Sequence, residues 1–151
     1  MKPVYQKAFR LMFLLIVMNA VGAIGALFVT PSALEWYHQL KLATLTPPDI
    51  VFGIVWTILY TLMAISAFLT WQKTSPRWFC LFTAMTLLWP FVFFYLKSIV
   101  GGMIVIGLML ILYVPLIRGF WYVSRPAGIL LIPVGLWTLF ASYLNGSLLL
   151  G

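Results

Sequence analysis

Five long apolar segments divide this chain, and each is long enough to cross a lipid bilayer. A spanning helix needs about 20 mostly apolar residues, and within lipid a helix pairs its backbone groups inside one segment. Charged side chains make up only 7% of the chain, against about 25% in an ordinary soluble domain. The sequence therefore predicts an all-α membrane protein, a single domain over residues 1–151 built as a five-transmembrane-helix bundle, with helices over about 10–29, 50–71, 78–97, 99–117 and 127–149.

The basic residues lie singly at the ends of these segments, which is typical of membrane topology and not of a nucleic-acid-binding patch. If the N-terminus lies inside, Lys41 and Lys97 fall outside, and the inner side holds Lys2, Lys7, Arg10, Lys73, Arg77, Arg118 and Arg125. This bias predicts a multi-pass protein with its N-terminus inside, and we expect the bacterial cell membrane and no nucleic acid partner. In an outer membrane or an organelle the labels would change, because the rule describes insertion from the cytoplasm.

The loop over residues 30–49 carries Trp36, Tyr37 and the rigid pair Pro47-Pro48. We interpret it as a lid over a binding site, because a floppy connector would not need these side chains. Trp36 and Tyr37 either pack on a ligand or anchor at the membrane interface, and the sequence leaves both readings open. His38 is the only histidine. It could ligate a haem iron, although a lone loop histidine is more often simply solvated.

The tryptophans fall into two groups. One group lies at the inner ends of the predicted helices, as in an interfacial aromatic belt, and comprises Trp71, Trp78 and Trp121, next to Tyr122. At about 1.5 Å per residue, Trp56, Trp89 and Trp137 lie roughly 9 Å, roughly 13 Å and roughly 18 Å below the outer ends of three different helices. Lipid offers no partner for an indole N–H. These three side chains either share an aromatic pocket or fill a packed bundle.

The predicted spans hold no acidic, basic or histidine side chain away from their ends. Ion pumps and proton-coupled carriers usually carry such a residue, so this class is disfavoured. The polar groups within the spans are hydroxyls and amides, namely Asn19, Thr57, Thr61, Ser66, Thr83, Thr86, Thr138, Ser142 and Asn145. Such groups among aromatics suit a large, flat, mostly apolar ligand. Motifs for hydrolases, nucleotide binding and metalloproteases are missing from the sequence, so we predict no catalytic residue, no metal site and no required cofactor.

Four patterns in order, covering about residues 19–146, resemble the tryptophan-rich sensory protein (TspO) family, the bacterial relatives of the mitochondrial translocator protein, or peripheral-type benzodiazepine receptor. Each pattern alone is weak, but four at the right spacing on five spans are highly specific. They are Trp36-Tyr37-x-x-Leu40 before Pro47-Pro48; Val51-Phe52-x-x-Val55-Trp56-Thr57-x-Leu59-Tyr60-x-x-Met63-Ala64; Trp89 with Phe93-Phe94 and Lys97; and Ala127-Gly128-x-Leu130-x-x-Pro133-x-x-x-Trp137-x-x-Phe140-Ala141-x-x-Leu144-Asn145.

The resemblance implies a homodimeric membrane receptor, sensor or carrier that binds a tetrapyrrole, such as protoporphyrin IX or haem. It also implies binding of synthetic ligands of the isoquinoline carboxamide type. Alternatives are a slow, light-dependent porphyrin-degrading enzyme, a structural membrane interaction protein and a dedicated transporter. Carried over by position, the ligand-binding residues are Trp36, Pro47, Phe52, Trp56, Tyr60, Trp89, Phe93, Trp137, Ala141 and Leu144.

The chain departs from the family pattern at several positions. Leu42-Ala43 stand where the lid usually has Lys-Pro, and Leu45 stands where it usually has Trp. Thr86 replaces an Asn, and Val134 replaces a Tyr. An indole near the bound porphyrin ring is the expected reductant in light-dependent degradation of the porphyrin. Leu45 and Thr86 therefore argue against this activity. The lost Tyr and the missing basic residue after Asn145 remove a cholesterol-recognition pattern that is itself hypothesis-grade, so sterol binding is not expected as a main role.

Overall fold

The computed structural model describes residues 3–150, which form helices joined by short connections. Five of the helical segments are long and apolar enough to span a membrane, and no strand occurs within the described residues. The all-α, five-span membrane architecture predicted from the sequence is therefore confirmed. In chain order the elements are α1 (Pro3–Ala26), α2 (Pro31–His38), α3 (Asp49–Leu69), α4 (Arg77–Pro90), the π-helix η1 (Phe91–Tyr95), α5 (Ile99–Val123) and α6 (Arg125–Leu150).

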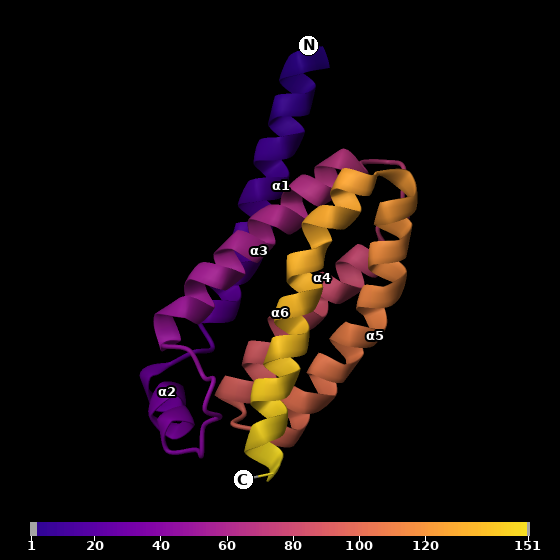
Figure 1. Ribbon diagram of the computed structural model, residues 1–151. Helices are drawn as coiled ribbons and strands as arrows, with labels where there is room; N and C mark the ends of the chain where they lie inside the picture. Colours follow the sequence, from indigo (N-terminus) through magenta and orange to yellow (C-terminus); the bar gives the residue numbers. More distant parts are fainter. Residues whose placement is uncertain (1–2, 151) are drawn as a thin grey trace.

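The long helices form a closed ring in the order α1, α3, α6, α5, α4 and back to α1. The contact between α1 and α4 is the least extensive in that ring. Figure 1 shows the two termini at opposite ends, as an odd number of spans requires, with α1 projecting past its neighbours at the N-terminal end. The short helix α2 lies at the other end, which we name the lid end, close to the end of α6.

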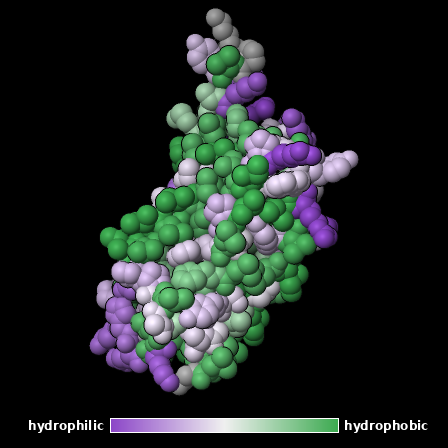
Figure 2. Space-filling view, viewed as in Figure 1, coloured by the Kyte–Doolittle hydropathy of each residue, from purple (hydrophilic) through white to green (hydrophobic). Residues whose placement is uncertain are grey.

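On the face shown in Figure 2, apolar residues form a belt across the middle of the molecule, and hydrophilic residues gather towards its two ends. Large apolar side chains point outward along this belt, among them Ile54, Ile58, Ile104, Ile111 and Leu136. Water would not favour so many exposed apolar groups together, whereas acyl chains accept them. The chain is an integral, multi-pass membrane protein.

Several boundaries differ from those predicted. The first helix covers residues 3–26 instead of 10–29, and the fourth span continues to Val123 instead of ending at 117. Proline removes one backbone donor but often only bends a membrane helix, so α5 passes through Pro115. The predicted third span, 78–97, changes from α-helix to π-helix after Pro90.

The lid loop contains a helix that the sequence reading did not predict. Thr30 caps α2, because its Oγ1 accepts a hydrogen bond from the backbone N–H of Ala33 at 3.2 Å, and Pro31 occupies the first helical position. Both features are standard helix-start signals. The part of the lid that carries Trp36 and Tyr37 is therefore a regular helix, which fixes the directions of these two side chains.

The most extensive contact between two helices is that of α5 with α6. The Tyr113 hydroxyl donates to the Leu131 carbonyl at 2.8 Å, and its ring lies directly over Gly135, where an added Cβ would collide with it. Leu131 and Val134 on the same helix are fully buried. This tight seam leaves little free space on one side of the bundle, and the space lies on the side of α1.

Candidate ligand-binding site

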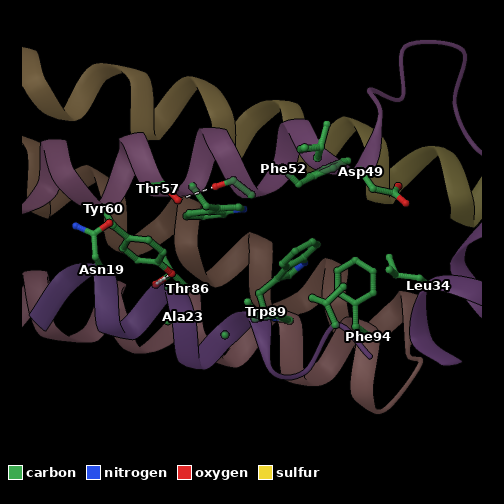
Figure 3. Close-up of a pocket in the computed structure, with 18 of the residues that line it drawn as sticks. Asn19, Ala23, Leu34, Asp49, Phe52, Thr57, Tyr60, Thr86, Trp89 and Phe94 are labelled. Atoms are coloured by element: carbon green, nitrogen blue, oxygen red, sulfur yellow. Dashed lines mark hydrogen bonds between the residues drawn. The ribbon is translucent and has the colours of Figure 1, made fainter. Parts of the chain in front are cut away.

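A cavity of about 660 Å³ lies between α1, α3 and α4, below α2. Cavities that bind small molecules commonly have about 300–1,000 Å³. Figure 3 shows it as an elongated space, with Asn19 and Tyr60 at one end and Leu34 and Asp49 at the other. We name the end at Asn19 and Tyr60 the deep end of the cavity. The opposite end of the cavity, at Leu34 and Asp49, is the one nearer the lid end of the molecule. From Asp49 to Tyr60 along α3 the distance is about 16 Å at the rise of an α-helix.

The wall formed by α1 consists mainly of small residues. Gly22, Ala23, Gly25 and Ala26 all line the cavity, at spacings that share a helix face. Gly22 is packed against the ring of Tyr60, whose Cδ2 would lie 2.7 Å from an added Cβ. Larger side chains on this face would fill the space, so the cavity exists because α1 lacks them.

The facing wall is aromatic. Phe52, Trp56 and Tyr60 line the cavity from α3 and follow each other at intervals of four residues, which places them on one side of the helix. The rings of Trp56 and Tyr60 have centroids 5.5 Å apart. Trp89 adds an indole from α4. Four of the sequence-predicted residues, Phe52, Trp56, Tyr60 and Trp89, thus meet at one cavity.

Hydroxyl and amide groups gather at the deep end. The Tyr60 hydroxyl donates to Thr86 Oγ1 at 3.1 Å, and the Thr57 hydroxyl donates to the Gly53 carbonyl at 2.8 Å; both bonds are dashed in Figure 3. Asn19 lies beside them and donates its amide to the Leu15 carbonyl at 3.0 Å. These groups give an otherwise apolar cavity one polar terminus.

The lid is held down by polar contacts and by aromatic packing. His38 Nε2 lies 2.8 Å from Asp49 Oδ2, and Lys97 Nζ donates to Ser32 Oγ at 3.0 Å. Tyr37 is only 6% exposed and packs edge-on against the rings of Phe93 and Phe94. Burial, and next the negative charge of Asp49, raise the pKa of the Tyr37 hydroxyl above its ordinary value, so it is neutral at physiological pH.

A second, much smaller pocket adjoins the cavity. It has about 20 Å³, which is room for about one water molecule. Phe93, Ala141 and Leu144 line it, and the wall between the two spaces consists of the residues that line both, Tyr37, Phe52, Trp89 and Phe94. The sequence prediction had grouped Phe93, Ala141 and Leu144 with the others in one site.

Three predicted residues do not line either of the two spaces. Trp36 packs edge-on against Phe93 with centroids 5.6 Å apart, and Trp137 packs edge-on against Phe52 at 5.8 Å. Within the described part of the chain, Trp36, Pro47 and Trp137 line neither space. Trp36 and Trp137 therefore support ring positions in the wall, and Pro47 lies in the connection that precedes α3.

The contribution of α1 was missed as part of the site. From the sequence, Gly22, Gly25 and Ala26 lie on one side of the first helix, a pattern that is typical of ordinary helix packing, and Asn19 is one of the polar groups within the spans. The same helix face, which also holds Ala23, was the available signal for a cavity wall. Residues 3–150 hold no group of three His, Cys, Asp or Glu side chains that could share a metal ion.

Comparison with known proteins gives consistent matches. The model of the TspO/MBR family matches residues 13–150. The tryptophan-rich protein TspO of Chlorobaculum tepidum is 37% identical over 139 residues, which cover 86% of this chain and 87% of that protein. TspO of Archaeoglobus fulgidus is 32% identical, covering 83% and 86%. The tryptophan-rich sensory protein of Cereibacter sphaeroides is 31% identical, covering 83% and 84%.

Proposed function

We propose that this chain, which belongs to the TspO/MBR family, is a membrane receptor, sensor or carrier that binds a tetrapyrrole such as protoporphyrin IX or haem. Membership of this family, together with the name "tryptophan-rich sensory protein" of one relative, supports the coarser class of a membrane sensor or receptor. The tetrapyrrole is our proposal from the shape and chemistry of the cavity.

The observation that carries the proposal is the pairing of two different walls around about 660 Å³. Aromatic rings from α3 and α4 offer faces and edges to a flat conjugated ligand, and such ring contacts add about 0.5–1.5 kcal/mol each beyond the burial of area. The small residues of α1 leave the opposite side open. A flat ring between these walls would contact Trp56 and Trp89 together.

The deep end of the cavity offers no cation, which favours one direction of insertion. Within the residues described, no lysine, arginine or histidine lines the cavity, and an ionised carboxylate is costly to bury without a partner. The propionates of a porphyrin would therefore remain at the lid end, towards water and the amine of Lys97, which bonds Ser32 of α2. They would have to point away from the carboxylate of Asp49, which also lines the lid end.

Two further properties belong to this proposal. We expect that the same cavity accepts flat synthetic amides of the isoquinoline carboxamide type, and that the protein functions as a homodimer. The N-terminus would lie on the inner side of the bacterial cell membrane, and the cavity would then occupy the outer half of the bilayer. Cross-linking in native membranes and protease access to the lid loop test the dimer and the orientation separately.

A titration with protoporphyrin IX tests the function. The protein in lipid nanodiscs should shift the Soret absorption band saturably, with micromolar or tighter affinity, equivalent to about −8 kcal/mol. Replacing the cavity-lining indole in Trp56→Leu should weaken binding. Trp121→Leu is the control, since Trp121 is 43% exposed at the far end of α5. Unsaturable partitioning equal to that of empty nanodiscs would reject the proposal.

A further inference from the structure

We propose that the deep end of the cavity is a subsite for an uncharged hydrogen-bond donor, a hydroxyl or N–H group carried at the buried end of a polycyclic ligand. The inference rests on the proposed function only in placing a ligand in this cavity. Beyond that function, we infer which chemical group of the ligand the protein selects at the end of the cavity farthest from the lid.

The hydroxyl donors at the deep end are already used within the protein. The Tyr60 hydroxyl donates to Thr86 Oγ1 at 3.1 Å, and the Thr86 hydroxyl in turn donates to the Thr83 carbonyl at 2.7 Å. The Thr57 hydroxyl donates to the Gly53 carbonyl at 2.8 Å. A hydroxyl has one donor and two acceptor lone pairs, so what Tyr60 and Thr57 still offer to a ligand is acceptor capacity.

The amide of Asn19 is arranged in the same sense. Its Nδ2 donates to the Leu15 carbonyl at 3.0 Å and to Thr61 Oγ1 at 3.4 Å. A carbonyl can only accept, so the first of these bonds fixes which amide atom is nitrogen. Within residues 3–150, Asn19 Oδ1 accepts no hydrogen bond, and Figure 3 shows this oxygen on the Tyr60 side of the side chain.

Three acceptor oxygens, from Asn19, Thr57 and Tyr60, therefore line one end of an apolar cavity. No lysine, arginine or histidine lines the cavity within the described residues. A carboxylate placed there would meet oxygen lone pairs without a counter-charge, at a high desolvation cost. A hydroxyl or N–H would satisfy at least one of these acceptors. The deep end thus discriminates by charge and by donor capacity, independently of ring size.

The experiment uses three pyrene probes that differ at one substituent: 1-pyrenemethanol, 1-methylpyrene and 1-pyrenecarboxylate. Protein in phosphatidylcholine nanodiscs is titrated with each, and energy transfer from tryptophan to pyrene is recorded after subtraction of empty nanodiscs. We expect the alcohol to bind about fivefold tighter than the methyl probe, the typical net value of one neutral hydrogen bond. The carboxylate should bind about tenfold or more weaker than the alcohol.

Two threonines provide a matched pair of variants. Thr57 and Thr138 both donate to the carbonyl four residues earlier at 2.8 Å, but only Thr57 lines the cavity. Thr57→Val and Asn19→Leu should each reduce the preference for the alcohol over the methyl probe. Thr138→Val should leave the preference unchanged, since it removes an equivalent hydroxyl elsewhere.

The outcomes separate this inference from the proposed function. Equal binding of alcohol and methyl probes, a preference that persists in both Thr57→Val and Asn19→Leu, or tight binding of the carboxylate overturns the donor subsite. A preference for the alcohol that these variants abolish supports it, even if protoporphyrin IX fails to bind to the same nanodiscs, in which case only the tetrapyrrole is rejected. Failure of all three pyrene probes to bind overturns the subsite.

Discussion

Trp89 stacks on Phe93 with ring centroids 5.2 Å apart and an angle of 12° between the ring planes. The pair joins two regions, because Trp89 lines the cavity while Phe93 lies against Trp36 and Tyr37 of α2. It also bridges the change from α-helix to π-helix at Pro90. Short π-helical turns within α-helices often occur at functional sites. Contact with a ligand at Trp89 would therefore be transmitted directly to the packing of the lid.

Truncating the second ring of this pair should loosen the lid. Phe93 is 2% exposed, and a buried Phe→Ala change costs about 3–5 kcal/mol. Because Trp36 and Tyr37 lose their common partner, we expect Phe93→Ala to accelerate hydrogen exchange at the amides of α2 before other helices respond. Phe9→Ala, at a ring that is 66% exposed on α1, is the control. Unchanged exchange in α2 would contradict this role.

The seam between α5 and α6 should tolerate no added methyl group at Gly135. A Cβ there would collide with the Tyr113 ring, and overpacking of this kind typically costs about 1–3 kcal/mol. We expect Gly135→Ala to lower the thermal unfolding midpoint in detergent. Gly107→Ala has no atom within 4 Å of the new Cβ and should leave the midpoint equal or slightly higher. Equal midpoints for the two variants would show that the seam can adjust.

The lid should respond to alkaline pH through Tyr37. Burial and the charge of Asp49 raise the pKa of its hydroxyl in the folded protein above the unfolded value of about 10. The stabilisation is then complete below about pH 10 and is lost as pH rises through the folded-state pKa. The difference between the tyrosinate absorption titrations of the wild type and Tyr37→Phe should show that Tyr37 titrates later than an exposed tyrosine. A step for Tyr37 at or below its ordinary pKa would contradict the burial argument.

Trp137 should affect ligand binding indirectly. Its ring supports Phe52 edge-on at 5.8 Å, and one aromatic contact is worth about 0.5–1.5 kcal/mol. We expect Trp137→Ala to weaken protoporphyrin IX binding about two- to tenfold, and less than Trp56→Leu does. The Soret titration compares the two variants. The opposite order would mean that the ligand lies against α6 instead of α1.

Sequence reasoning could find the spans and the aromatic wall, because both depend on local chemistry. Runs of apolar residues determine the helices, and Phe52, Trp56 and Tyr60 share a face by spacing alone. The depth of Trp137 in its span was equally visible, but its separation from the cavity depends on Phe52 standing between them. The space beside α1 reflects what Gly22 and Gly25 lack, and an absent side chain gives a weaker pattern than a present one.

The most direct test fills the cavity without disturbing the fold. Gly53 lines it, and neither Gly53 nor Gly107 has a neighbouring atom within 4 Å of an added Cβ. Protoporphyrin IX is titrated against the wild type, Gly53→Leu and Gly107→Leu in nanodiscs. We expect saturable binding that Gly53→Leu weakens about tenfold or more, a loss of about 1.4 kcal/mol, and that Gly107→Leu leaves unchanged. Equal affinity in all three proteins would show that the ligand does not occupy the space between α1, α3 and α4.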